Sequence, residues 1–377
     1  MNIAYVYPWD VVGDPSAPER LAALGVDAVA LAAVYHSTRA ATPYHPSHRV
    51  LDVPYPAFYL PVRPSAWGRL VPAAPTWTPA DAYLQARDAL KAVGLPVHAW
   101  TVLTHNSHLG AAHPDLVVRN AFGDPYPYAL CPAHEDVIEY CERLVQEILT
   151  VGEPDGLILE ACGPLGFGHQ SVHEKTSGAD WTSVDADLLS LCFCEACAPR
   201  YPEPTRTQVR AAIDRTGDMS APQPTTVEEA LGPVADEVLA IRVGLSTSLR
   251  ERLIAVSRRT APNVPITLHA NPDPWAAGAF APLPAGEPGA DALVANCWGD
   301  PSTDATRLTR LTELSRAGQR VGAYVLALPP RPADAAVLTD HLRTYAKAGA
   351  TEFHLYHAGL ASRERLTALT EALRQIT

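Results

Sequence analysis

The sequence is poor in charged residues, and in lysine above all. Charged residues make up 19% of the 377-residue chain, against about 25% in an average soluble protein. The chain has three lysines (Lys91, Lys175 and Lys347) and no basic run, and its 41 acidic residues outnumber 29 basic ones to give a net charge of −12. Because binding to nucleic acid or to an anionic membrane needs clustered Lys and Arg, we expect neither partner.

Long hydrophobic runs are also missing. No stretch reaches the roughly 18 consecutive apolar residues of a membrane helix. Met1 leads directly into the strand-like segment NIAYVYP and not into a basic region followed by an apolar one. These features predict a cytoplasmic protein. Seven cysteines is an odd number for a disulfide framework, so we expect free thiols or metal ligands in a reducing compartment.

What the chain does contain is an alternation of short apolar runs with helical patterns. Strands of a parallel sheet are buried on both faces and appear as continuous apolar segments. Glycines suited to ending helices precede several of them, at Gly25, Gly94, Gly318 and Gly349. This order favours an α/β fold, a (β/α)8 TIM barrel, over a doubly wound sheet with fewer units. The eight predicted strands are Asn2–Pro8, Asp27–Val34, Pro96–Leu103, Asp155–Glu160, Val264–His269, Ala290–Cys297, Arg320–Leu328 and Thr351–Tyr356.

The length of the chain suits one barrel with large loops. A minimal barrel takes about 250 residues, so well over a hundred residues remain. We expect a single domain over 1–377, with a long loop after strand two (36–78) and a helical insertion before strand five (202–262). The 36 prolines are about twice the usual share and indicate ordered, irregular loops that wall a pocket.

Polar and aromatic side chains gather where the predicted strands end. In a barrel, the carboxyl ends of the strands and the loops after them carry the chemistry. Aromatic rings can stack on a sugar ring while amides, hydroxyls and imidazoles bind its hydroxyl groups. The sequence therefore predicts a carbohydrate pocket, with these substrate-binding residues: Tyr7, His36, His105, Asn106, His173, His269, Asn296, Trp298, Tyr356 and His357.

Glu160 is the sharpest catalytic candidate. The apolar strand DGLILE delivers this one carboxyl at its end, where partial burial would raise its pKa and suit a general acid. Glycoside hydrolysis needs a second carboxyl group. Glu174, Asp10 and Asp300 all lie on the expected catalytic face.

Three cysteines within six residues indicate a metal site. The sequence pattern predicts a helix near Val184–Tyr201 after strand four. Within it, Cys192, Cys194 and Cys197 form C-F-C-E-A-C, and three thiols this close suit tetrahedral Zn²⁺ with one further ligand. The spacing leaves that ligand open among a histidine and the remaining cysteines Cys131, Cys141, Cys162 and Cys297.

A resemblance narrows this choice. The pairing of ALCPAHEDVIEYCERLV with LCFCEACAPRY is similar to family 42 glycoside hydrolases, the β-galactosidases, and to segments of bacterial glycosyl-hydrolase-like barrels. In family 42 a CP segment opens the third helix and binds a structural zinc together with a C-x-C-x-x-C after strand four. The resemblance implies Cys131, Cys192, Cys194 and Cys197 as ligands of a structural Zn²⁺. It also implies an acid/base role for Glu160, because the family's acid/base glutamate closes strand four.

The chain departs from family 42 at two positions. Leu159 precedes Glu160 where the family has asparagine, and strand seven runs into Ala327–Pro329 where the family has its nucleophilic glutamate.

We therefore expect a carbohydrate-active enzyme that hydrolyses a glycosidic bond, with a small carbohydrate or glycoside as substrate and with a composition compatible with a homo-oligomer. One alternative is a metal-dependent sugar isomerase, epimerase or lyase with His105, Glu160 and His269 as metal ligands. Another is a sugar-binding barrel without catalysis.

Overall fold

A closed barrel of eight parallel strands forms the centre of the molecule, so the predicted (β/α)8 fold is confirmed. The structure, a computed structural model, describes residues 1–168, 175–215 and 223–376. β1 pairs with both β14 and β2, which closes the sheet on itself. In order around the barrel the strands are β1 (Asn2–Val6), β2 (Ala28–Tyr35), β6 (Val97–Val102), β9 (Gly156–Glu160), β10 (Ile266–Asn271), β12 (Ala292–Cys297), β13 (Arg320–Leu326) and β14 (Glu352–Tyr356).

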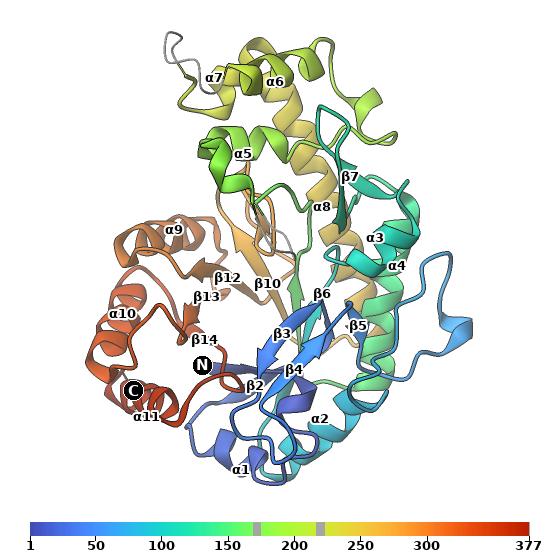
Figure 1. The fold of residues 1–377 in the computed structure, drawn as a ribbon. Coiled ribbons are helices and arrows are strands. Elements are labelled where there is room, and N and C mark those ends of the chain that lie inside the picture. The colour runs from blue at the N-terminus through green and yellow to red at the C-terminus, as the bar shows by residue number, and fades with distance from the viewer. Residues whose placement is uncertain (169–174, 216–222, 377) are drawn as a thin grey trace.

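Helices surround the barrel because each carries one apolar stripe that packs on the strands. Figure 1 shows α9, α10 and α11 side by side on one flank and the long α8 crossing the other. The shell helices are α1 (Ala17–Ala22), α2 (Ala82–Ala92), α4 (Glu135–Glu147), α8 (Ala235–Thr260), α9 (Pro301–Leu314), α10 (Ala335–Lys347) and α11 (Arg363–Ile376). In the described part of the chain, no helix has both the length and the apolar character needed to span a bilayer.

The long loops contain regular structure of their own. The segment after β2 forms the β3–β4 hairpin (Thr38–Ala41 and Val50–Val53) and a short β5 (Ala57–Phe58) that pairs antiparallel with β2. After β6 come α3 (Ser107–Ala112) and the β7–β8 hairpin (Val117–Arg119 and Pro125–Leu130). A two-residue β11 (Ala281–Pro282) pairs in parallel with the end of β10.

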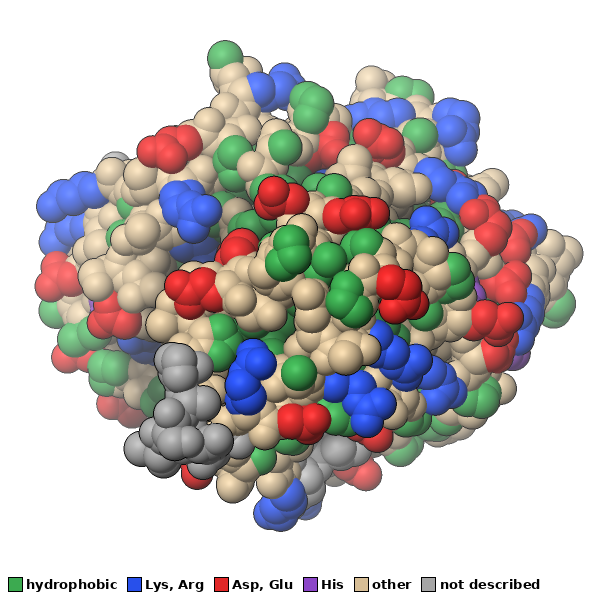
Figure 2. All heavy atoms as spheres, turned by 90° about the horizontal axis from the view of Figure 1, so that it is seen from above, with side chains coloured by type: hydrophobic (Ala, Val, Ile, Leu, Met, Phe, Trp, Pro, Cys, Tyr) green, Lys and Arg blue, Asp and Glu red, His purple; other side chains and the backbone are tan. Residues whose placement is uncertain are grey.

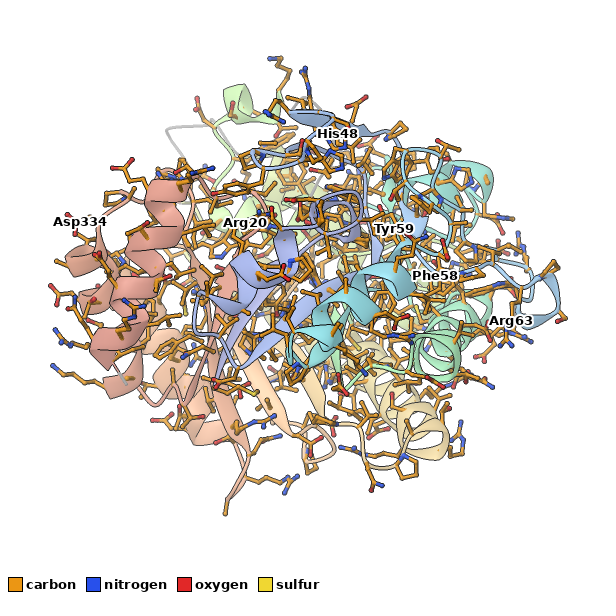
Figure 3. All side chains as sticks on the ribbon, turned by 90° about the horizontal axis from the view of Figure 1, so that it is seen from below. Arg20, His48, Phe58, Tyr59, Arg63 and Asp334 are labelled. Carbon is orange, nitrogen blue, oxygen red and sulfur yellow. The ribbon has the colours of Figure 1, made fainter. Side chains whose placement is uncertain are left out.

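The loop after β5 is fixed to the barrel shell by a buried carboxylate. Figure 3 labels Arg63 near the outer edge of the molecule. Its guanidinium donates to both carboxylate oxygens of Glu147 at the end of α4, at 2.8 and 2.6 Å. Such a two-pronged pair holds both groups in one orientation.

A second, smaller hydrophobic core lies outside the barrel. It joins α5 (Ser183–Leu189), α6 (Thr205–Asp214) and α7 (Val227–Leu231) to the start of α8. Figure 1 shows these helices stacked at one end of the molecule, away from α1 and α2. Figure 2 looks onto this end and shows acidic and basic side chains interspersed among hydrophobic and other atoms.

The barrel interior is unusually polar. Inward-facing positions of such barrels are commonly filled by Val, Ile and Leu, yet here Tyr5, His269, His354 and Glu352 occupy the centre and are all fully buried. Gly322 leaves room for two of these side chains, because a Cβ at this position would lie 3.1 Å from atoms of both Glu352 and His354. These polar side chains connect the two ends of the barrel.

Candidate active site

A cavity of about 590 Å³ opens at the carboxyl ends of the barrel strands. This volume lies in the range of small-molecule sites, about 300–1,000 Å³. Its lining contains five of the residues that we predicted for the site: His36, Glu160, Asn296, Trp298 and Tyr356. The carboxyl ends of the strands therefore converge here as the barrel geometry requires.

Aromatic rings form the walls of the cavity. Trp298, whose side chain is 37% exposed, stacks on Tyr324 with ring centroids 5.4 Å apart and also contacts Tyr356 at 4.8 Å. Trp100 packs edge-on against Tyr35 at 4.6 Å on another wall. Flat, partly exposed rings beside polar groups are suited to the face of a sugar ring.

Glu160 lies at the end of β9 and is 6% exposed. The indole nitrogen of Trp100 donates to its Oε2 at 2.7 Å, and His269 Nδ1 lies 3.2 Å from the same oxygen. Burial raises the pKa of this carboxyl, but the contact and charge of His269, the indole of Trp100 and the charge of His36 lower it more, so the pKa ends below its ordinary value. The expected rise in the pKa of Glu160 is therefore wrong, because the buried strand end also supplies partners for the carboxylate.

Asp304 is the other carboxylate in the described lining of the cavity. It is fully buried at the start of α9 and accepts a hydrogen bond from Arg307 Nη1 at 2.8 Å. Burial raises the pKa of Asp304 and Arg307 opposes that rise. Arg307 also donates to the Asn296 carbonyl at 2.7 Å. Asp304 thus orients Arg307, which in turn holds the backbone of Asn296 at the wall.

His36 contributes an imidazole to the lining. Burial lowers its pKa, against the opposing effects of the Ser37 carbonyl and Glu160. Its Nδ1 lies 2.8 Å from the Ser37 carbonyl oxygen, so we assign the proton to Nδ1, which makes Nε2 an acceptor.

Four further predicted residues lie behind the lining. His269 lies against Glu160, and Phe280 stacks on it at 4.5 Å. The rings of Tyr7 and His357 contact each other in a tilted arrangement with centroids 4.2 Å apart, and the Tyr7 hydroxyl lies 3.4 Å from that of Tyr356. The His105 ring lies 4.4 Å from the ring of His36. These residues support the cavity wall and do not face the cavity.

Asn106 and Asp10 have local structural partners. Asn106 caps α3, where its Oδ1 accepts from the Leu109 amide at 3.0 Å. Asp10 is buried in the turn after β1 and does not line the cavity, and its Oδ2 accepts from the Tyr7 amide at 2.8 Å. Burial raises the pKa of Asp10 to about 7, against the opposing effects of Tyr7 and Arg20.

The three remaining residues that we predicted for the site are Asp300, Glu174 and His173. Asp300 is exposed and caps α9, accepting from the Ser302 amide at 2.9 Å. Glu174 and His173 lie outside the described residues.

Several lining residues were not assigned a role from the sequence. Trp100 and Tyr324 occupy inward positions two or more residues before their strands end, and Phe280 and Arg307 come from a loop and a helix. The alternation of Tyr324 with smaller residues in RVGAYVL was the one available signal. Tyr324 lies two residues before the end of β13, so the position of the strand end alone does not indicate it.

The four predicted cysteines converge at a second, closed site. Their sulfurs all lie within 4.8 Å of one another, and all four residues are buried. Cys131 Sγ lies 3.5 Å from Cys197 Sγ and 3.7 Å from Cys194 Sγ. These distances are too long for a disulfide, at about 2.05 Å. They fit the sulfur–sulfur separation of about 3.8 Å that tetrahedral Zn–S bonds of about 2.3 Å imply.

The cysteine segment is a loop and not part of the predicted helix Val184–Tyr201. α5 ends at Leu189, and the amide of Cys194 approaches Cys192 Sγ at 3.4 Å as the chain turns. Helical geometry would point Cys192, Cys194 and Cys197 in different directions, so convergence on one centre requires the turn. The site ties the segment after α5 to Cys131, which follows β8.

The metal-dependent alternative finds no matching ligand set. Within the described ranges, the four cysteines are the one group of three or more metal-ligating side chains close enough to share an ion. Both ring nitrogens of His269 face protein groups, Glu160 on one side and Tyr5 on the other. This arrangement gives no support to a His105–Glu160–His269 metal centre.

Comparison with solved structures identifies the class of fold. A β-galactosidase from the psychrophilic Marinomonas ef1 is similar over 100% of this chain and 59% of its own, with 12% identity and a TM-score of 0.59. The β-amylase catalytic domain from Paenibacillus polymyxa is similar over 100% and 98%, with 13% identity and a TM-score of 0.56. A GH42 β-galactosidase from G. stearothermophilus is similar over 100% and 56%, with 9% identity and a TM-score of 0.55.

The chain therefore has the barrel fold of glycoside hydrolases, including the GH42 β-galactosidases, and it spans less than three fifths of the length of those two β-galactosidases. No protein-family model matches the sequence. No curated protein matches it either. At about 10% identity these similarities establish the fold, and the site's own chemistry has to carry the function.

Proposed function

We propose that this protein is a carbohydrate-active enzyme that cleaves a glycosidic bond, with Glu160 as its acid/base residue. The observation that carries the proposal is the position of Glu160 in an aromatic-walled cavity at the carboxyl ends of the barrel strands. Trp298 and Tyr356 would bind the faces of the sugar, and His36 and Asn296 its hydroxyl groups. The glycoside hydrolase fold of the chain supports this reaction class.

Hydrolysis needs a second carboxyl group, and three residues are candidates for it. Retaining enzymes place the two carboxyls about 5–5.5 Å apart and inverting enzymes about 6.5–9.5 Å apart. Asp304 shares the cavity lining but is bound by Arg307. Glu174 remains the candidate from the loop after β9. Asp10 is the weaker candidate because it is buried and capped by its own turn.

The decisive experiment replaces Glu160 by glutamine and compares aryl glycosides with good and poor leaving groups. An acid/base residue protonates a poor leaving group in the transition state and contributes about 10²–10⁴-fold. We expect Glu160→Gln to lose about a thousandfold in kcat/KM on an alkyl or phenyl glycoside and far less on a dinitrophenyl glycoside. Equal loss on both would assign Glu160 as nucleophile. Full activity in the variant would contradict the proposal.

The exposed residue Glu313 on α9 provides the matched control, since Glu313→Gln makes the same chemical change away from the cavity. Calorimetry with Glu160→Gln should show that the glycoside still binds.

One observation favours a second function, sugar binding without catalysis. β13 ends at Leu326 and runs into Ala327–Pro329, where a retaining family 42 enzyme has its nucleophilic glutamate, and β13 contributes Tyr324 and no carboxylate to the described lining of the cavity. This function predicts that the wild-type protein binds a glycoside that it does not hydrolyse, across a broad panel of substrates.

A further inference from the structure

A second cavity, of about 390 Å³, lies beside the Glu160 cavity. Asn271, Thr303 and Arg307 line both cavities, so the two border each other along these side chains. The described lining of the second cavity is mainly polar and, unlike that of the first, contains no aromatic ring. Its volume is sufficient for a small molecule or for one unit of a larger one.

One wall of the second cavity is a single face of α9. Thr303, Thr306, Arg307 and Arg310 are spaced by three and four residues, which places them in one row along the helix. Arg307 is held by Asp304 at 2.8 Å. Arg310 is exposed and forms no hydrogen bond or ion pair within the described chain. Its guanidinium therefore has all its donors available to a ligand.

The segment that follows β10 provides the other wall. Asn271 Oδ1 accepts a hydrogen bond from the Asp273 amide at 3.0 Å, and Asp273 Oδ1 accepts from the Trp275 amide at 3.0 Å. Among the described residues, Asn271 Nδ2 and Asp273 Oδ2 have no hydrogen-bond partner. This wall therefore offers one amide donor and one carboxylate acceptor to the same cavity.

Buried contacts hold this second wall in place from behind. Arg242 on α8 is 3% exposed, and its Nη2 donates to the carbonyl oxygens of Trp275 at 3.2 Å and Ala276 at 3.0 Å. The indole nitrogen of Trp275 donates to Glu228 Oε1 on α7 at 2.6 Å. A wall that is fixed before a ligand arrives loses little conformational entropy on binding, which favours affinity.

We propose that the second cavity binds a further sugar unit, so that the substrate is an oligosaccharide and not a simple glycoside. This inference rests on the proposed function of Glu160. Sugar hydroxyl groups both donate and accept hydrogen bonds, which matches a lining of hydroxyl, amide, guanidinium and carboxylate groups. Arg310 and Asp273 bring opposite charges, so the lining suits a neutral unit. Because no aromatic ring is present in the described lining, hydrogen bonds and not stacking hold this unit.

Binding of matched sugars tests the second cavity. Calorimetry in the Glu160→Gln background, which suppresses turnover, compares galactose, glucose and mannose with their α-1,4- and β-1,4-linked disaccharides. We expect the best disaccharide to bind about tenfold more tightly than its monosaccharide, because hydrogen bonds to charged groups contribute about that factor. Arg310→Ala should remove most of this tenfold ratio.

Arg259→Ala is the matched control. Arg259 lies on α8, is exposed, has no partner in the described chain and lines neither cavity, so its loss should leave the ratio unchanged. Asp273→Asn keeps an acceptor for the Trp275 amide and should lower the ratio by a smaller factor. A ratio that Arg310→Ala does not change, or equal affinities for monosaccharide and disaccharide before that substitution, would overturn the proposal.

Hydrolysis by the wild-type protein distinguishes this inference from the proposed function. Disaccharide binding that depends on Arg310, without hydrolysis of any glycoside, would contradict the proposed function alone. Hydrolysis of a monosaccharide glycoside, together with a binding ratio that is the same in Arg310→Ala and Arg259→Ala, would contradict the second cavity alone.

Discussion

The cysteine cluster and the Glu160 cavity offer opposite environments to their functional side chains. The four sulfurs lie within 4.8 Å of one another in a fully buried group, which leaves no position for a substrate. Glu160 has one oxygen held by Trp100 and His269 and borders an open cavity of about 590 Å³. A closed set of ligands stabilises structure, whereas an open set allows chemistry. Substitutions in the two regions should therefore affect different properties.

Disruption of the cysteine cluster should have the largest effect on stability. We expect Cys194→Ala to abolish a stoichiometric metal, Zn²⁺ by the ligand chemistry, and to lower the free energy of unfolding by about 3 kcal/mol or more, because metal binding is coupled to folding. Elemental analysis and thermal melts with and without a chelator measure both effects.

Cys141→Ala is the control for this prediction, since Cys141 is equally buried but lies outside the cluster. It should cost about 1 kcal/mol and leave the metal content unchanged. Equal destabilisation of both variants with no metal in either would mean that the cluster is a packing feature.

Asp10 belongs neither to the cysteine cluster nor to the cavity lining. It is a buried carboxyl close to aromatic residues at the cavity wall. Its pKa of about 7 in the folded protein exceeds an unfolded value of about 4. The folded state therefore holds a proton that the unfolded chain releases. The resulting stability is fully present below about pH 4 and is lost as pH rises to about 7, by about 4 kcal/mol at most.

Asp10→Asn should remove this component, so the difference in unfolding free energy between variant and wild type should change across pH 4–7. Denaturant titrations at several pH values measure it. A constant difference across that range would show that the Asp10 carboxyl ionises normally.

The smallest effect is expected at the exposed wall of the cavity. Trp298→Ala should weaken binding of a glycoside or product sugar by about tenfold, or roughly 1.4 kcal/mol, because one stacking face is lost. Folding stability should change little. Trp181 is similarly exposed, at 36% against 37%, and does not line the cavity, so Trp181→Ala should leave affinity unchanged. Equal affinities for both variants would remove Trp298 from the sugar site.

The order of strands and three of the four clustered cysteines could be predicted from local patterns in the sequence, whereas Cys131 followed only from the resemblance to family 42. Continuous apolar runs separated by amphipathic helices are sufficient to define eight β/α units. Three thiols within six residues define a metal-like cluster whatever surrounds them. By contrast, the sequence pattern predicted one helix from Val184 to Tyr201, whereas α5 ends at Leu189, before the cysteines. Helix propensity depends on neighbouring residues along the chain and does not show that the sulfurs must meet at one point.

The environment of each site residue was decided by tertiary structure. The apolar segment DGLILE is enough to predict that Glu160 ends a buried strand. Burial alone would raise the pKa of its carboxyl group. Only the closed barrel brings His269 from β10 and Trp100 from β6 to the same carboxylate oxygen and lowers that pKa. The contacts of the Tyr5 hydroxyl with His269 and His354 likewise join strands that are more than 260 residues apart in sequence. Charge interactions depend on separation in space, which periodicity along the chain does not encode.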